Sequence, residues 1–256
     1  MKPGSVAIVG AAETTEMGLI PNLSVIGLHA DAALNAMADC GLTAKDIDGV
    51  ATAGASPVEV AHYLGITPTY ADGTSVGGCS FMLHVRHAAA AINEGLANTI
   101  LITHGESGKS RIGGGRFGGS PASLQGQFEA PYGPSGPPSM FTIPVLRYMK
   151  EFGLTHEQLA MVSVVQREWA GMNPRASFRT PITVEDVMNS RMIAYPFHLL
   201  ECCLVTDGGG ALIMTSAERA KDFKTKPVYV IGTGESVETP LVSQMEDFTT
   251  SKAFRV

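Results

Sequence analysis

The chain has 256 residues, of which 45% are hydrophobic and 16% charged, and its formal net charge at pH 7 is −6. This length supplies a sizeable core for one large domain or two smaller ones. The acidic balance offers no Lys/Arg cluster that could offset phosphate charge, which argues against binding nucleic acid. No run of the sequence approaches the roughly 20 consecutive apolar residues that span a bilayer, so we expect no membrane span.

Strand-like and helical patterns alternate over the first hundred residues. A β-branched run over 5–14 predicts a buried first strand, and residues 23–40 carry apolar side chains at helical spacing before Gly41. The alternation continues with a strand-like segment, a short helix, a strand entering a turn, an alanine-rich helix and another strand, at 48–53, 58–66, 69–78, 80–95 and 96–105. This order predicts an α/β fold with a mixed, mostly parallel sheet and helices on its faces.

The segment THGESGKSRIGGG, from Thr103 to Gly115, follows a strand and contains GKS, as phosphate-binding loops do. That motif, G-x-x-x-x-G-K-[ST], needs a glycine at position 103, where this chain has threonine. The glycine-rich sequence after Ser110 also disfavours the helix whose N-terminus would meet the phosphate. We therefore interpret the segment as a strand that ends in a polar loop.

The composition of the sequence shifts toward Gly, Ser, Pro and Gln between Glu106 and about Pro138. Such a long stretch without a periodic pattern predicts a structureless functional flap. Helical patterns resume at 141–153 and 155–172, and the second opens on Thr155, a good N-cap residue.

The last third of the chain contains one more short helix and two strand signals. The helix is predicted over 184–189, and buried strands are predicted over 208–216 and 227–236. Asp207 and Gly208 are predicted to form the tight turn that enters the first of these strands.

The four cysteines, at 40, 79, 202 and 203, form no C-x-x-C pair, so a structural zinc site is not expected. Four cysteines in a chain of this size, two of them adjacent, do not make a disulfide framework. A reducing cytoplasm is the expected location.

The order of these segments resembles the first two thirds of the thiolase superfamily, in its sterol-carrier and lipid-transfer branch. The resemblance rests on SVGGCSFMLHVRHAAAAINEG, GES at 105–107, NPRASFR with PITVEDVMNSRMIAYP, and LLECCLVTDGGGALI. It implies a layered αβαβα architecture, a homodimer, and acyl-CoA substrates, with coenzyme A present as part of the substrate and no tightly bound cofactor.

The resemblance also implies how the chain divides. Residues 1–105 and 206–240 would form the N-terminal βαβα core, with a helical loop domain inserted at 106–205. Residues 241–256 would begin a C-terminal half that is missing, so we expect the chain to be a fragment of a longer protein.

In the family, a cysteine at the strand-to-helix turn before the alanine-rich helix is the nucleophile. A helix N-terminus favours a thiolate, which can accept an acyl group from a thioester. Cys79 is the candidate by proximity, but counting back from Gly95 places the family's cysteine at Gly78. If Cys79 is only a small packed thiol, Gly77 and Gly78 would leave room for substrate, and their N–H groups could polarise the thioester oxygen.

Three other sets of residues bear on the site. His104, at the end of a strand before the flap, is the histidine expected to line a cleft. His84 and His87 are one helical turn apart, but no third ligand lies near them in sequence, so no metal site is expected. Tyr132 and Gly133, in PYGPSGPP, are predicted to shape the flap over the substrate.

The displaced cysteine favours C–C bond cleavage or formation of the aldol type over thiolytic acyl transfer. The best-known aldol-type relatives work with a small partner protein that completes the active site, and the resemblance extends that expectation to this chain. Two alternatives stay open: an acetyl-CoA acetyltransferase-type thiolase that uses Cys79, and a non-catalytic subunit that binds acyl-CoA or lipid.

Overall fold

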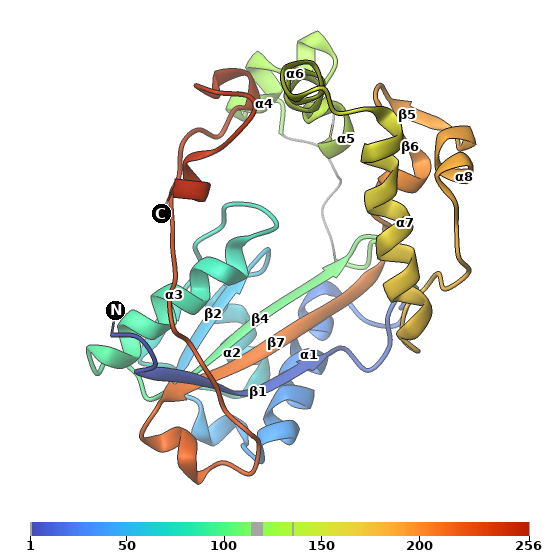
Figure 1. Ribbon diagram of the computed structural model, residues 1–256. Helices are drawn as coiled ribbons and strands as arrows, with labels where there is room; N and C mark the ends of the chain where they lie inside the picture. Colours follow the sequence, from blue (N-terminus) through green and yellow to red (C-terminus); the bar gives the residue numbers. More distant parts are fainter. Residues whose placement is uncertain (1, 114–119, 135, 256) are drawn as a thin grey trace. The chain divides into compact units, whose positions relative to one another are not determined.

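The computed structural model describes residues 2–113, 120–134 and 136–255 (Figure 1). It contains two compact units, which are described separately below. The first consists of residues 1–115 and 205–234, and the second of residues 116–204 and 235–256.

The first unit is built on a six-stranded sheet in the order β3-β2-β4-β7-β1-β8. β2 pairs in parallel with both β3 and β4, whereas β7 pairs antiparallel with both β4 and β1, and β8 pairs antiparallel with β1. Four of the six described strands therefore run in one direction, as predicted. The strands are β1 (Val6–Glu13), β2 (Gly49–Ala53), β3 (Tyr70–Asp72), β4 (Thr99–Ser107), β7 (Asp207–Ser216) and β8 (Val228–Tyr229).

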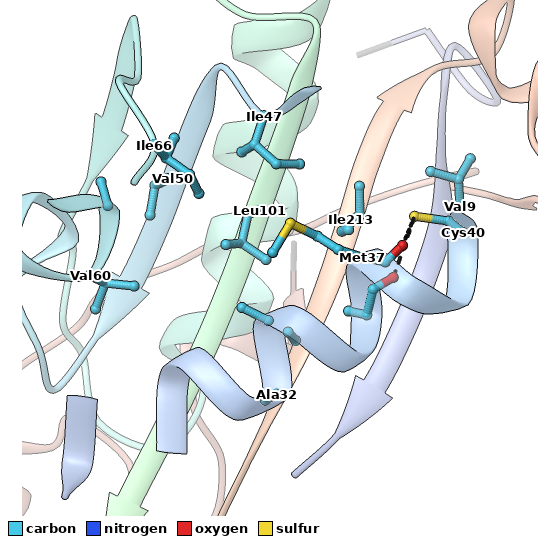
Figure 2. Packing of buried hydrophobic residues seen from close by; sticks show 14 of the residues in the cluster. Val9, Ala32, Met37, Cys40, Ile47, Val50, Val60, Ile66, Leu101 and Ile213 are labelled. Atoms are coloured by element: carbon cyan, nitrogen blue, oxygen red, sulfur yellow. Dashed lines mark hydrogen bonds between the residues drawn. The ribbon is translucent and has the colours of Figure 1, made fainter. Parts of the chain in front are cut away.

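Helices cover both faces of this sheet (Figure 1), which confirms the predicted fold class. On one face lie α1 (Val25–Cys40) and α2 (Pro57–Leu64), and Met37 of α1 packs with Leu101 and Ile213 of the sheet (Figure 2). On the other face lies α3 (Ser80–Asn93), whose alanines allow the helix to approach Ile100, Ile102 and Met214 closely. Burial of these apolar side chains, at about 25 cal/mol per Å², is the main force holding the layers together.

The strand β4 is longer than the sequence predicts. It continues past Gly105 to Ser107 because β7 supplies a partner as far as its first residue, pairing Ser107 with Asp207. The glycines of β7 make this close pairing possible: a Cβ added at Gly209 would lie 2.3 Å from the carbonyl oxygen of His104. The polar loop expected from Thr103 therefore begins five residues later, after Ser107, and residues 114–119 lie outside the described part of the chain.

Asp207 is a buried anchor, and the prediction that it forms a turn is wrong. It is 1% exposed and is the first residue of β7. Its carboxylate accepts hydrogen bonds from the backbone N–H groups of Ile20, Lys109 and Ser110, at 2.8 to 2.9 Å, and from Ser110 Oγ. Burial alone would raise the pKa of Asp207, but these hydrogen bonds outweigh it and hold the pKa below its usual value.

The predicted buried strand over 227–236 is also wrong. Only Val228 and Tyr229 form a strand, both are exposed, and they pair with β1 alone. β8 is thus a short edge strand, because its second neighbour is lacking among the described residues.

The second unit is largely helical, and its capping signals are legible in the sequence. Thr155 and Gln158 form a reciprocal capping box at the start of α7, and Thr183 and Asp186 do the same for α8. The expected structureless stretch is wrong in part, since two short helices interrupt it; residue 135 lies outside the described residues. The elements are α4 (Leu124–Phe128), α5 (Pro137–Met140), α6 (Thr142–Phe152), α7 (His156–Met172), α8 (Val184–Asn189) and a hairpin of β5 (Met192–Ala194) and β6 (Phe197–His198).

Candidate active site

The turn between β3 and α3 is open at its glycines. Gly77 has a φ of +87°, which glycine adopts without strain, and no atom lies within 4 Å of a Cβ added at Gly77 or Gly78. Cys79 is the N-cap residue of α3; its thiol is exposed and makes no capping hydrogen bond. Among the described residues, the N–H groups of Gly78 and Cys79 meet no acceptor. The turn therefore presents two free backbone donors and a thiol at a helix N-terminus.

Hydrogen bonds from Ser80 stabilise this turn. Ser80 is 1% exposed, and its hydroxyl accepts a hydrogen bond from the Val76 N–H at 2.9 Å while donating one to the Gly77 carbonyl at 2.6 Å. The Ser80 N–H also donates to Gly77 O, at 3.1 Å. Ser80 is buried and the neighbouring Cys79 is exposed, so of these two side chains the thiol is the one that points outward.

A second set of polar contacts fixes the approach to the turn. Thr74 donates through its N–H and its hydroxyl to Asp72 Oδ1, at 2.9 and 2.7 Å. His84 Nε2 donates to Thr74 O at 2.9 Å, and His87 Nδ1 donates to Asp72 Oδ2 at 2.7 Å. The two histidines thus bind the segment ahead of the turn, and among the described residues no group of metal-ligating side chains is assembled around them or elsewhere.

Burial determines the charge of His84. The side chain is 0% exposed, and burial lowers its pKa more than the nearby Asp72 and the Thr74 carbonyl raise it. The neutral ring therefore carries its proton on Nε2, where Thr74 O accepts it. Asp72 shows the opposite balance: burial would raise its pKa, but hydrogen bonds from Thr74 and His87 hold it below the usual value.

His104 lines a cavity of about 630 Å³ on the α3 face of the sheet. Phe81, from the first turn of α3, lines the same cavity, and its ring centroid lies 6.0 Å from that of His104. His104 Nδ1 donates to Ala53 O at 3.1 Å, and Nε2 lies 3.2 Å from Glu106 Oε1. The rest of the wall comes from the end of β1, from Ile102 and Thr103 of β4, and from residues 209–212 of the glycine-rich β7. Cys79 is absent from the described lining, although it precedes Phe81 by only two residues.

His29 of α1 stands behind His104 and was not predicted from the sequence. It is 0% exposed, its ring centroid lies 6.0 Å from that of His104, and both its ring nitrogens are without a partner among the described residues. Burial, and then the nearby His104, lower the pKa of His29 to about 4. A histidine on an otherwise apolar, alanine-rich helix face was the one available signal.

Tyr132 belongs to the second unit and is 86% exposed. Together with Gly133, which has a φ of +113°, it lines a separate cavity of about 680 Å³ within that unit. The other candidates, Gly77, Gly78, Cys79 and His104, all lie in the first unit.

Comparison with known proteins identifies the class. No family model matches the chain. It is 36% identical to the 17-hydroxy-3-oxo-4-pregnene-20-carboxyl-CoA lyase of Mycobacterium tuberculosis, over 90% of this chain and 62% of the lyase. It is 32% identical to the acetyl-CoA acetyltransferase of Methanothermobacter thermautotrophicus, over 95% of this chain and 65% of that enzyme.

A solved structure agrees closely with the fold. The Ltp2-ChsH2(DUF35) aldolase superposes with a TM-score of 0.88 and 32% identity, over 99% of this chain and 67% of that one. The chain belongs to the thiolase superfamily, as the sequence predicts. It spans somewhat less than two thirds of the length of the curated relatives it matches. No helix among the described residues is long and apolar enough to cross a membrane.

Proposed function

We propose that this protein is a thiolase-superfamily enzyme that cleaves a C–C bond in a bulky β-hydroxyacyl-CoA thioester by retro-aldol chemistry. The choice of this chemistry over acyl transfer rests chiefly on one observation. The position expected for the family's nucleophile is Gly78, which offers open space and a free N–H, while the thiol of Cys79 stands one residue further on. The similarity to a 17-hydroxysteroid acyl-CoA lyase and to an aldolase supports the same choice.

In this reaction a base removes the proton of the β-hydroxyl group, and the oxygen electrons form a ketone carbonyl. The C–C bond breaks, its electron pair moves to the α-carbon as a thioester enolate, and a proton then adds to that carbon. The products are a ketone and a shortened acyl-CoA, so no oxidant or reductant is needed. Free N–H groups at the open turn suit the enolate oxygen, because fixed donors stabilise charge that develops during the reaction.

Partners and location are also part of the proposal. The aldolase of similar structure is a complex with a DUF35 protein, which supports a small partner protein here, and we propose a homodimer of the main chain. Four free thiols, at Cys40, Cys79, Cys202 and Cys203, suit a reducing compartment such as the cytoplasm.

There are two alternatives, of which the first has specific support. The exposed Cys79 at the N-cap of α3 and the acetyltransferase relative favour an acyl-transferring thiolase. A non-catalytic acyl-CoA-binding subunit would retain the cavities without turnover.

Cys79→Ala in the full-length protein separates these functions. With acyl-CoA substrate and any partner protein present, retro-aldol cleavage should keep within about threefold of its wild-type rate, because the thiol takes no part in it. Mass spectrometry of the wild-type protein should show no acyl adduct on Cys79. An adduct that disappears in the variant, together with loss of turnover, would establish acyl transfer instead. Tight binding without turnover in either protein would establish the binding subunit.

A further inference from the structure

The cavity in the second unit, here called the Glu129 cavity, has features of a ligand site of its own. Its volume of about 680 Å³ falls in the range, roughly 300 to 1,000 Å³, that holds a drug-sized molecule. Much of its wall is apolar or aromatic, from Phe128, Tyr132, Met140, Ile143 and Phe248. Tyr132 is the residue that the sequence singles out in this unit.

Glu129 is a buried carboxylate in this wall. Glu129 directly follows the last residue of α4, and it is 5% exposed. Oε1 accepts a hydrogen bond from the Ser243 N–H at 2.7 Å, which ties residues 242–244 to the cavity. Oε2 is buried and has no hydrogen-bond partner among the described residues. One oxygen therefore has a structural role and the other has none.

An unpaired buried carboxylate oxygen is costly, and native proteins rarely retain one without a use. The described lining of the cavity contains no Lys, Arg or His that could pair with it. A molecule that enters the cavity can supply the donor that this oxygen lacks among the described residues. Because the surrounding wall is apolar, that molecule must be mostly apolar while carrying at least one donor group.

We propose that the Glu129 cavity binds an apolar ring system that carries a hydroxyl group, and that Glu129 Oε2 accepts the hydrogen bond of that hydroxyl. The inference rests on the proposed function, whose substrates combine a bulky apolar body with a hydroxyl and carry no cation near it. Glu129 is then a specificity-determining residue. Replacing Glu129 should lower the affinity for the hydroxylated ligand to that for the unhydroxylated one. The affinity for the unhydroxylated ligand should not change.

Two steroids that differ by one hydroxyl provide the probe: 17α-hydroxyprogesterone and progesterone. Their dissociation constants would be measured by equilibrium dialysis against the full-length protein, without coenzyme A. A hydrogen bond to a charged acceptor corresponds to a preference of roughly tenfold or more for the hydroxylated steroid. Glu129→Gln keeps an acceptor for Ser243 but replaces Oε2 by a neutral NH₂ group, which can only donate to the oxygen of the steroid hydroxyl. Because a neutral hydrogen bond is weaker than one to a carboxylate, the preference should fall below about threefold.

Glu168→Gln is the matched control, because Glu168 is an exposed carboxylate on α7 in the same unit and should leave the preference unchanged. Progesterone binding by Glu129→Gln at wild-type affinity shows that the variant is folded. Equal affinity of the wild-type protein for the two steroids overturns the proposal, whatever the variants do, and so does a preference that survives Glu129→Gln. Failure of acyl-CoA cleavage would refute the proposed function instead, since the steroid preference is measured without turnover.

Discussion

Asp207 offers the sharpest test of how the first unit is held together. In Asp207→Asn, one face of the side chain becomes an NH₂ group that points at N–H donors. If it faces the N–H groups of Lys109 and Ser110, their two hydrogen bonds are lost; if it faces Ile20, the bonds from the Ile20 N–H and from Ser110 Oγ are lost, and the buried Ile20 N–H is left unpaired. A hydrogen bond to a charged group is worth about 1.5–3 kcal/mol, and an unpaired buried donor costs about 1–3 kcal/mol.

Even the less unfavourable of these two amide orientations destabilises the first unit by about 3 kcal/mol. For a chain of this size the midpoint of thermal unfolding should fall by about 6–12 °C, and circular dichroism would measure it, with Glu94→Gln as an exposed control. The pKa of Asp207 is lowered on folding from 3.8, so its charge stabilises the fold above pH 3.8 and that stabilisation is lost as the pH falls through the folded value. The difference between variant and wild type should therefore shrink below pH 3.8. A midpoint unchanged within 2 °C at neutral pH would refute the anchoring role.

Two further substitutions test the site itself. Ser80→Ala removes the contacts to Val76 and Gly77, worth about 2 kcal/mol together; it should lower kcat about tenfold, and wild-type turnover would show that the turn keeps its shape without the hydroxyl. Gly209→Ala sets a Cβ 2.3 Å from His104 O and should destabilise the unit by about 1–3 kcal/mol in urea unfolding. Gly210→Ala, whose Cβ would meet nothing closer than 3.7 Å, is its control, and equal stability of the two would contradict the close packing of β4 on β7.

Features that depend on near neighbours in sequence were predictable. The helix at 184–189 has the predicted bounds, and α7 begins after Thr155 with the predicted cap. α3 starts at Ser80, as its composition indicates, because helical periodicity and caps involve residues three or four apart. The class of protein was also legible, since the turn before α3 and the DGGGALI segment are both local motifs.

Only the tertiary structure decided which polar groups meet. The donors to Asp207 lie 97, 98 and 187 residues away in sequence, so no local pattern distinguishes this anchor from a turn. His29 comes beside His104 because α1 packs on the sheet where β4 passes. The free oxygen of Glu129 likewise follows from a contact with Ser243, 114 residues away. Periodicity and propensity act over a turn or two of chain, whereas burial and hydrogen-bond pairing are settled only when distant segments pack together.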